Sequence, residues 1–246
     1  MLAVAMRLTV DLPVPATVVA VGAHPDDAEF GCGATLAKWA DAGAAVHLVV
    51  CTDGSKGSWD PREDLDDLVA RRAHEQRLAA DALGAKGVHF LGATDGELRA
   101  STALEAALCD VIRRIRPDVV VTHDPWRPHR LHPDHHWAGL LTIGAIVAAR
   151  DWHFHPDQPY EPHRPDVLLL FETHHADHVE RVHDHVDRKI EALLCHRSQW
   201  RSTMGIDDRP DEQRARFAQR IRDRARADGL RAGVRAGESF HRVDDL

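Results

Sequence analysis

The sequence predicts an α/β protein with a Rossmann-like, mostly parallel sheet that is covered by helices on both faces. Short, continuous apolar segments such as residues 18–22 and 119–122 are typical of strands that are buried on both faces. Helical patterns separate these segments, so strands and helices alternate through the first two thirds of the 246 residues. Polar residues directly follow the apolar segments, where ligands bind in a parallel sheet.

Three strands and two helices are predicted in the first part of the chain. Apolar segments predict strands over residues 18–22, 46–51 and 88–91. The helical patterns between them cover residues 33–42 and 67–83. Gly84 directly follows the second helix and is a typical C-cap, because glycine readily adopts the left-handed conformation.

The alternation continues in the middle of the chain. A helix is predicted over residues 104–115, and Pro117 ends it because the residue before a proline disfavours the helical conformation. Strands are predicted over residues 119–122 and 166–171. An irregular segment that is rich in proline and histidine, residues 151–164, precedes the last of these strands.

The last third of the chain is expected to be helical. Helical patterns cover residues 182–200 and 211–227, and no further strand is predicted. We expect a single domain over residues 1–246, with an α/β core at about 16–175 and a C-terminal helical part at about 176–246.

The overall charge argues against a protein that binds nucleic acid or an anionic membrane surface. The formal net charge is −8, and the arginines of residues 209–235 are interleaved with acidic residues, as on a solvated helix face. No apolar stretch approaches the roughly 20 residues that a membrane-spanning helix needs. The sequence therefore predicts no nucleic-acid partner and no membrane span.

The cysteines and the N-terminal residues together predict a cytoplasmic protein. Cys32, Cys51, Cys109 and Cys195 are scattered without paired C-x-x-C spacing, which is typical of reduced thiols. Arg7 and the prolines that follow it interrupt the apolar N-terminus before it reaches the length of a signal-peptide core.

The motif Ala23-His24-Pro25-Asp26-Asp27 directly follows the first predicted strand. Pro25 stiffens the turn and removes an amide donor, and one imidazole and two adjacent carboxylates crowd the same few residues. A polar turn after a buried strand is the structural alternative. A divalent metal explains the residue types better, because His24 and Asp27 are close enough to bind one ion from a short loop.

A second motif, His132-Pro133-Asp134-His135-His136, lies far downstream and follows another predicted strand. Catalytic zinc usually takes three nitrogen or oxygen ligands from the protein and keeps a fourth position for water. His24, Asp27 and one histidine of the second motif satisfy this count. The two motifs together predict a mononuclear site with zinc as the default metal, although iron(II) or cobalt(II) would also fit.

Further polar residues trail the other predicted strands and are expected to converge on the same rim: Asp53, Asp95, His123, Asp124, Glu172 and His174. Turn capping is the structural alternative for Asp53 and for Asp95, which precedes a glycine. The histidine-rich residues 174–185 are predicted to lie on the surface or at a contact between subunits of a homo-oligomer.

The chain resembles the LmbE-like (PIG-L) zinc-dependent N-deacetylases, which act on N-acetylglucosamine-type groups. The specific matches are residues 23–27 with Glu29 and residues 132–135. Less specific matches extend through most of the chain: Thr52-Asp53-Gly54, Arg72 with Glu75, Leu83-Gly84, Asp95-Gly96, Arg116-Pro117-Asp118, residues 189–192 and residues 196–199. One departure is that Ala28 intervenes before Glu29, where many relatives have glutamate directly after the two aspartates.

The resemblance implies a hydrolase that removes an acetyl or other acyl group from an aminosugar conjugate, a small-molecule partner. It implies His24, Asp27 and His135 as the metal ligands. Asp26 would be the general base for the attacking water, a separate role from that of the adjacent ligand. Zinc would polarise the carbonyl and lower the pKa of water toward roughly 7.

The resemblance also implies roles for four residues around the metal. His132 would stabilise the oxyanion or protonate the leaving amine, and a good oxyanion donor contributes about 3–4 kcal/mol. Asp134 would orient His132 and raise its pKa. Arg72 and Asp95 would contact the substrate, although Arg72 could instead form a surface ion pair with Glu75.

Three other functions are compatible with parts of the sequence. A metal-dependent phosphoesterase also uses His/Asp loops, but a two-metal site would need more bridging carboxylates than these motifs provide. A non-catalytic sugar-binding module fits the polar rim but leaves Asp26 without a role. A nucleotide-binding Rossmann protein is disfavoured, because Gly31-Cys32-Gly33 lies well past the strand and lacks the third glycine.

Overall fold

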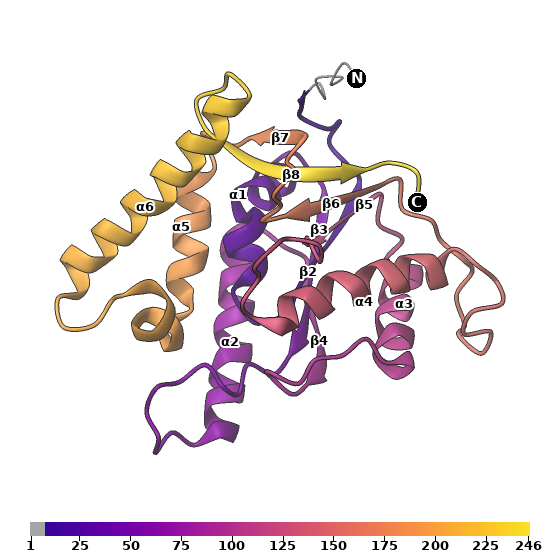
Figure 1. Ribbon diagram of the computed structural model, residues 1–246, viewed down its shortest axis with the longest axis horizontal. Coiled ribbons are helices and arrows are strands. Elements are labelled where there is room, and N and C mark those ends of the chain that lie inside the picture. Colours follow the sequence, from indigo (N-terminus) through magenta and orange to yellow (C-terminus); the bar gives the residue numbers. More distant parts are fainter. Residues whose placement is uncertain (1–7) are drawn as a thin grey trace.

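An eight-stranded sheet forms the centre of the protein in the computed structural model, which describes residues 8–246 (Figure 1). Arg7, used above to argue against a signal peptide, lies outside the described residues. The strands are β1 (Thr9–Val10), β2 (Thr17–Gly22), β3 (Ala45–Thr52), β4 (Gly87–Ala93), β5 (Val119–His123), β6 (Val167–Phe171), β7 (His178–Arg181) and β8 (Gly237–Val243). Their order in the sheet is β1-β7-β8-β6-β5-β2-β3-β4.

The five predicted strands are confirmed and form one parallel block, β6-β5-β2-β3-β4. Their observed ends differ from the predicted ends by no more than two residues. Parallel pairing brings all five carboxyl ends to one edge of the sheet, as the sequence predicts.

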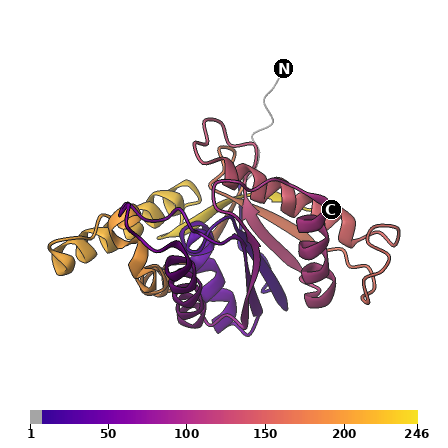
Figure 2. The ribbon, with the colours of Figure 1, turned by 90° about the horizontal axis from the view of Figure 1, so that it is seen from below.

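Within residues 8–246, six α-helices accompany the sheet: α1 (Asp27–Asp41), α2 (Leu65–Leu83), α3 (Thr102–Ile115), α4 (Pro133–Ala149), α5 (Val186–Cys195) and α6 (Pro210–Arg231). Apolar residues of α1, α2 and α5 pack on one face of the sheet, and those of α3 and α4 pack on the other (Figure 2). Alternate residues of β2 enter the two cores, with Val18 in one and Val19 in the other. The predicted covering of both faces is therefore confirmed.

Helix α1 begins six residues earlier than predicted, inside the first motif, and it is broken at Cys32. Cys32 has φ −147° and ψ 17°, so the helix stops and starts again, close to the predicted start at residue 33. Glu238 of β8 accepts hydrogen bonds from the amides of Ala34 (3.2 Å) and Thr35 (2.7 Å). Its carboxylate thus satisfies amide donors that the break leaves unpaired.

Helix α4 was not predicted, although it begins within the second motif. Its residues are apolar nearly throughout, so they show no amphipathic period that would distinguish a helix. Local signals are nevertheless present: Pro133 occupies the first turn, and the His132 side chain accepts a hydrogen bond from the amide of Asp134.

The prediction that residues 176–246 are only helical is wrong, because this part also contributes β7 and β8. Strand β8 pairs antiparallel with both β6 and β7, and β1 pairs with β7. The predicted helix over residues 182–200 is shorter: α5 is followed by a 3₁₀ turn (Arg197–Gln199) and a π-helical turn (Trp200–Met204). β8 is short and mostly polar, so its sequence does not indicate a strand, although the strand lies inside the sheet.

The histidine-rich residues 174–185 do not all lie on the surface. His178 is fully buried in β7, where Nε2 lies 2.8 Å from Oε1 of Glu180, whereas His174 and His175 are exposed. Among the helices of residues 8–246, none combines the length and apolar character that crossing a membrane requires.

Candidate active site

A cavity of about 420 Å³ lies at the carboxyl edge of the parallel strands. It is lined by His24, Asp26, Asp27, Phe30, Lys56, Gly57, Arg72, Asp95, His132, His135, Glu172, Gln199 and Thr203. Seven of the eight site residues chosen from the sequence are among them. The eighth, Asp134, is fully buried behind the cavity.

The first motif forms a tight connection between β2 and α1. Asp26 has φ 103°, a left-handed conformation that is strained for a residue other than glycine. The Asp26 amide donates to Oε1 of Gln76 (3.0 Å), and the His24 amide donates to Oδ2 of Asp27 (2.7 Å). Gly22 permits this packing, since a Cβ there would lie 2.9 Å from Cβ of Asp27.

The three predicted metal ligands meet around the Asp27 carboxylate. Nδ1 of His24 lies 3.3 Å from Oδ2 of Asp27, and Nε2 of His135 lies 3.4 Å from Oδ1 of Asp27. Tetrahedral ligands at about 2.0–2.1 Å from zinc are themselves about 3.4 Å apart. Each of the two pairs has the separation of two zinc ligands, but the two imidazoles face different oxygens of Asp27. Among the described residues, the sets of donor atoms that lie within 4.8 Å of one another are His24 with His132 and His135, His24 with Asp95, His132 and Asp134, and Asp27 with His123 and His135.

The other side of the His24 ring faces two carboxylates. Nε2 of His24 lies 3.1 Å from Oδ1 of Asp95 and 3.3 Å from Oδ2 of Asp134. Burial would lower the pKa of His24, but these carboxylates and Asp27 raise it well above its usual range. A proton shared with Asp95 and Asp134 leaves Nδ1 of His24 free for a metal, the usual arrangement of a ligating histidine.

The Asp134 carboxylate lies near His132, as predicted, but within the described residues it makes no hydrogen bond to it. The carboxylate faces His24 and accepts hydrogen bonds from the amides of Gly96 (2.7 Å) and Leu98 (3.3 Å). Only the Asp134 amide reaches His132, at 3.3 Å from Nδ1. Burial, together with the neighbouring His24 and His135, lowers the pKa of His132. Asp134 raises it, as predicted, but does not outweigh these effects.

Asp26 and Asp27 lie in different environments despite being adjacent. Burial raises the pKa of Asp26 to about 6, and Arg72 opposes this shift from 3.8 Å. Burial would also raise the pKa of Asp27, but His135 and His123 outweigh it and hold the pKa well below the usual range. One carboxylate is thus suited to accept a proton near neutral pH, and the other to stay ionised.

Arg72 belongs to the cavity and does not form the surface ion pair with Glu75. It is 3% exposed and donates to the carbonyl oxygens of Gly54 (2.9 Å) and Pro25 (2.8 Å). Glu75 instead accepts from the amide (2.9 Å) and hydroxyl (2.6 Å) of Ser198. The segment after α5 is thereby fixed to α2, beside the cavity.

A further group of residues supports the Asp27 side of the site. Nε2 of His123 lies 3.1 Å from Oδ2 of Asp27. Nη1 of Arg130 lies 3.1 Å from Nδ1 of His123, 2.9 Å from Nδ1 of His135 and 2.9 Å from Oε2 of Glu172. The positions of His123 and Glu172 after strands indicated the rim, but nothing in the sequence distinguishes Arg130 from other loop arginines.

Comparisons with known proteins agree with this geometry. A family model described as "PIG-L: GlcNAc-PI de-N-acetylase" matches residues 19–146, which contain both motifs. The chain is 33% identical over 186 residues to diacetylchitobiose deacetylase of Thermococcus kodakarensis, covering 74% of this chain and 70% of that protein. It is also 34% identical over 169 residues to 1D-myo-inositol 2-acetamido-2-deoxy-alpha-D-glucopyranoside deacetylase of Kineococcus radiotolerans, covering 56% of this chain and 46% of that protein.

The similarity extends to solved structures. N,N'-diacetylchitobiose deacetylase from Pyrococcus horikoshii superposes with a TM-score of 0.84 at 30% sequence identity. The match covers 94% of this chain and 84% of that protein, so it includes the C-terminal part beyond the family model. The sequence motifs, the arrangement of the cavity and these matches lead to one conclusion: the chain belongs to the PIG-L (LmbE-like) deacetylase family.

Proposed function

We propose that the protein is a metal-dependent deacetylase that removes an acetyl, or another acyl, group from the amide nitrogen of an N-acetylglucosamine-type sugar conjugate. The observation that carries this proposal is that His24 and His135 face the two oxygens of the Asp27 carboxylate, at 3.3 Å and 3.4 Å, beside the buried Asp26. The relatives named as deacetylases of acetylated aminosugars support the substrate class.

His24, Asp27 and His135 would hold the metal, with zinc as the proposed ion and iron(II) as the alternative. When bound, the metal would polarise the acyl carbonyl and lower the pKa of a water toward about 7. Asp95, Asp134 and His123 orient the ligands through the contacts described above.

Asp26 would take the proton from the attacking water. Its carboxylate lines the cavity next to Asp27, and its raised pKa makes it a stronger base than an exposed aspartate. Arg72 holds the Asp26 loop through the carbonyl of Pro25 and leaves guanidinium charge near the carboxylate. Arg72 is also proposed, with Asp95, to contact the sugar.

His132 would act on the other side of the reacting amide. Its ring lies 4.5 Å from that of His24 (centroid to centroid), and its Nε2 is 4.0 Å from Oδ1 of Asp95. Its ring N–H would donate to the developing oxyanion, and its lowered pKa would make the protonated ring a readier proton donor to the nitrogen of the leaving amine.

Metal content and amine release from acetylated aminosugars test the proposal together. We expect about one metal ion per chain, as in mononuclear catalytic sites, with loss of both metal and amine release in Asp27→Ala. Two metal ions with phosphate release from phosphate esters would instead favour a phosphoesterase. Tight sugar binding without turnover would favour a non-catalytic module.

The compartment is proposed to be the cytoplasm. The four cysteines are free, and Cys32, Cys51 and Cys109 are buried in the core, where reduced thiols pack as small apolar side chains. The homo-oligomer predicted from the sequence stays a prediction.

A further inference from the structure

The side chain of Asp26, the proposed base, makes no hydrogen bond of its own within residues 8–246. Its carboxylate lines the active-site cavity, and Nη2 of Arg72 lies 3.8 Å from Oδ2. Since no closer contact holds the carboxylate, its position in the cavity is set mainly by the backbone conformation of Asp26.

Residues 24–27 form a β-turn of type II. The amide of Asp27 donates to the carbonyl oxygen of His24 (3.3 Å), and Asp26 occupies the third position with φ 103° and ψ −20°. A type II turn requires a positive φ at this position, where glycine is the usual residue. A type I turn, which differs by a rotation of the central peptide group, would give Asp26 an unstrained φ of about −90°. The observed turn therefore needs support from outside residues 24–27.

Two side chains of α2 bind the two ends of this central peptide group. Oε1 of Gln76 accepts from the amide of Asp26 (3.0 Å), and Nη2 of Arg72 donates to the carbonyl oxygen of Pro25 (2.8 Å). Arg72 and Gln76 are four residues apart, so they lie on one face of the helix. Rotating the peptide group would direct its N–H at the guanidinium, which has no acceptor, and its carbonyl at the Gln76 oxygen. A type I turn would therefore lose both hydrogen bonds.

Gln76 is itself fixed in the orientation that accepts from Asp26. It is 1% exposed, and its Nε2 donates to Oε1 of Glu29 (2.5 Å). Glu29 is fully buried, and Nε2 of His196, directly after α5, lies 3.8 Å from the same oxygen. If the amide of Gln76 were turned around, its oxygen would face the Glu29 carboxylate, where neither group has a proton to donate. The Gln76 oxygen is therefore directed at Asp26.

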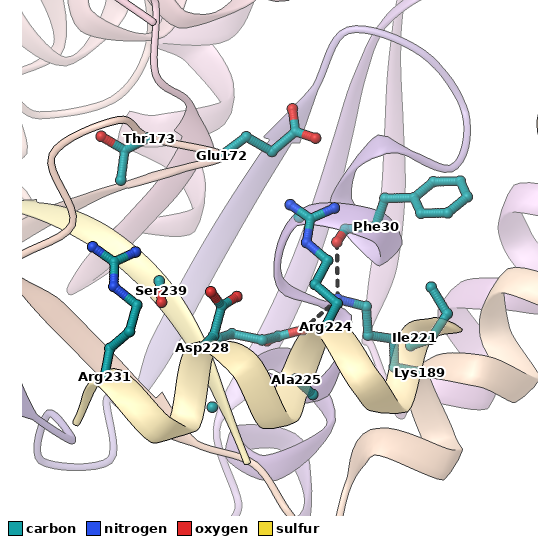
Figure 3. A pocket seen from close by; sticks show the side chains of 13 residues that line it. Phe30, Glu172, Thr173, Lys189, Ile221, Arg224, Ala225, Asp228, Arg231 and Ser239 are labelled. Atoms are coloured by element: carbon teal, nitrogen blue, oxygen red, sulfur yellow. Dashed lines mark hydrogen bonds and ion pairs between the residues drawn. The ribbon is translucent and has the colours of Figure 1, made fainter. Parts of the chain in front are cut away.

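The first part of α1, which follows the turn, is also held near its far end. Nζ of Lys189 donates to the carbonyl oxygen of Phe30 (2.8 Å), shortly before the helix breaks at Cys32 (Figure 3). A movement of this short segment would break that bond. Rotation of the Pro25–Asp26 peptide group is therefore the simplest change by which Asp26 could reach an unstrained conformation.

We propose that Gln76 is a positioning residue of the reaction, which holds the Pro25–Asp26 peptide group in the type II orientation and thereby keeps the base directed into the cavity. Arg72 binds the other end of this peptide group and shares the role, in addition to its proposed contact with the sugar. The effect of Gln76 on turnover rests on the proposed function, whereas its effect on the turn can be measured without substrate.

A crystal structure of Gln76→Met tests the effect on the turn. Methionine is unbranched, as glutamine is, but it offers only a weak sulfur acceptor and no donor, so the turn should change to type I with a negative φ at Asp26. Gln76→Glu is the conservative variant, since its carboxyl oxygen can still accept from the Asp26 amide, and it should keep the positive φ. A positive φ in Gln76→Met, or a negative φ in Gln76→Glu, would overturn the inference.

Hydrolysis of an acetylated aminosugar should follow the turn. Gln76→Met should lower kcat by about a hundredfold, because a displaced base is poorly aligned with the attacking water. KM and the metal content should stay unchanged, as expected for a group that acts in the transition state. Gln76→Glu should recover part of the lost kcat. A wild-type kcat in Gln76→Met would overturn the positioning role, and so would a loss of kcat that is explained by loss of the metal.

Glu75→Gln is the matched control for effects of altering α2. Glu75 is the neighbour of Gln76 and is also buried, but it contacts Ser198 and not the turn. The variant should keep the type II turn and the wild-type kcat. A loss of kcat equal to that of Gln76→Met would show that any disturbance of this helix has the same effect, and would overturn the specific role of Gln76.

Thermal unfolding provides a measurement that needs neither crystals nor substrate. Glycine adopts a positive φ without strain, so Asp26→Gly should change the Tm more favourably in the wild type than in Gln76→Met, where the turn is already relaxed. Equal changes in the two backgrounds would overturn the inference. If the wild type hydrolysed no acetylated aminosugar, while the differences in the turn and in Tm were present, the proposed function would fail and the role of Gln76 in the turn would stand.

Discussion

At the scale of single residues, the two adjacent carboxylates of the first motif have different roles, one as a base and one as a metal ligand. Asp26 and Asp27 are adjacent, yet burial raises the pKa of the first to about 6, while His135 and His123 hold that of the second below its usual range against burial. Separating the pKa values of two carboxylates in this way assigns one as base and one as ligand.

Asp26→Asn should keep the metal and lose most turnover. The amide preserves the shape of the side chain but cannot accept the proton of the attacking water, so kcat should fall by about 10²–10⁴. Metal analysis and steady-state kinetics of the same preparation would check this. A variant that loses its metal would show that Asp26 also belongs to the ligand set.

The pH dependence of kcat/KM should report the same carboxyl group. Asp26 is active when ionised, so activity should decline tenfold per pH unit below its pKa of about 6. Arg72 favours the ionised form, and Arg72→Met should therefore move this acid limb to higher pH. A limb that stays near pH 4 in both proteins would contradict the assignment.

Asp134→Asn distinguishes two roles for the buried carboxylate. Because Asp134 contacts His24, the substitution should weaken zinc binding by about 10–100-fold, measured by competition with a chelator. His132→Ala is the comparison, and it should retain zinc with a reduced kcat. Unchanged zinc affinity in Asp134→Asn, with slow turnover, would restore the role of orienting His132.

At the scale of elements, α1 links the active site to the C-terminal strand. Its first turn carries Asp27, its break lies at Cys32, and its second part starts against Glu238 of β8. Lys189 of α5 completes this junction with bonds to Glu238 and to the carbonyl of Phe30 (2.8 Å). Two elements distant from α1 in the sequence, α5 and β8, therefore fix the direction in which α1 leaves the site.

Glu238→Ala should destabilise the fold by about 3–5 kcal/mol, because it leaves the buried ammonium of Lys189 unpaired. Urea unfolding followed by circular dichroism would measure the loss. Replacing both charges in Lys189→Met/Glu238→Leu should recover part of it. A small loss in the single variant, comparable with a surface substitution, would argue that the pair has little structural role.

At the scale of the whole molecule, the parallel block and the two motifs could be predicted, because both have local signals. Continuous apolar strands can be recognised in the sequence, and the residues that follow parallel strands must lie at the same edge of the sheet. β8 could not, since its partners β6 and β7 lie far away in the chain. The role of Arg130 could not either, since it depends on how its loop folds back against His123, His135 and Glu172. Asp134 was assigned to its neighbour His132, but the fold turned its carboxylate to His24.

The N-terminal segment predicts a pH dependence of stability. Burial would raise the pKa of Asp11, but bonds to Lys38 (2.8 Å) and Arg181 lower it from 3.8 to about 2. Folding therefore favours the ionised form, and this contribution is complete above about pH 4 and is lost as the pH falls toward 2. The difference in unfolding free energy between the wild type and Asp11→Asn should shrink over that range. A difference independent of pH would contradict this explanation.

The position of β8 has a consequence for protein synthesis. It leaves the ribosome after the other seven strands of this sheet, yet its place is inside the sheet, between β6 and β7. Until it arrives, the nascent chain exposes one open edge of β6, and unpaired edges of this kind invite aggregation. The second part of α1 also lacks the carboxylate of Glu238 until then, so the helix that carries Asp27 is completed only after β8 has been synthesised.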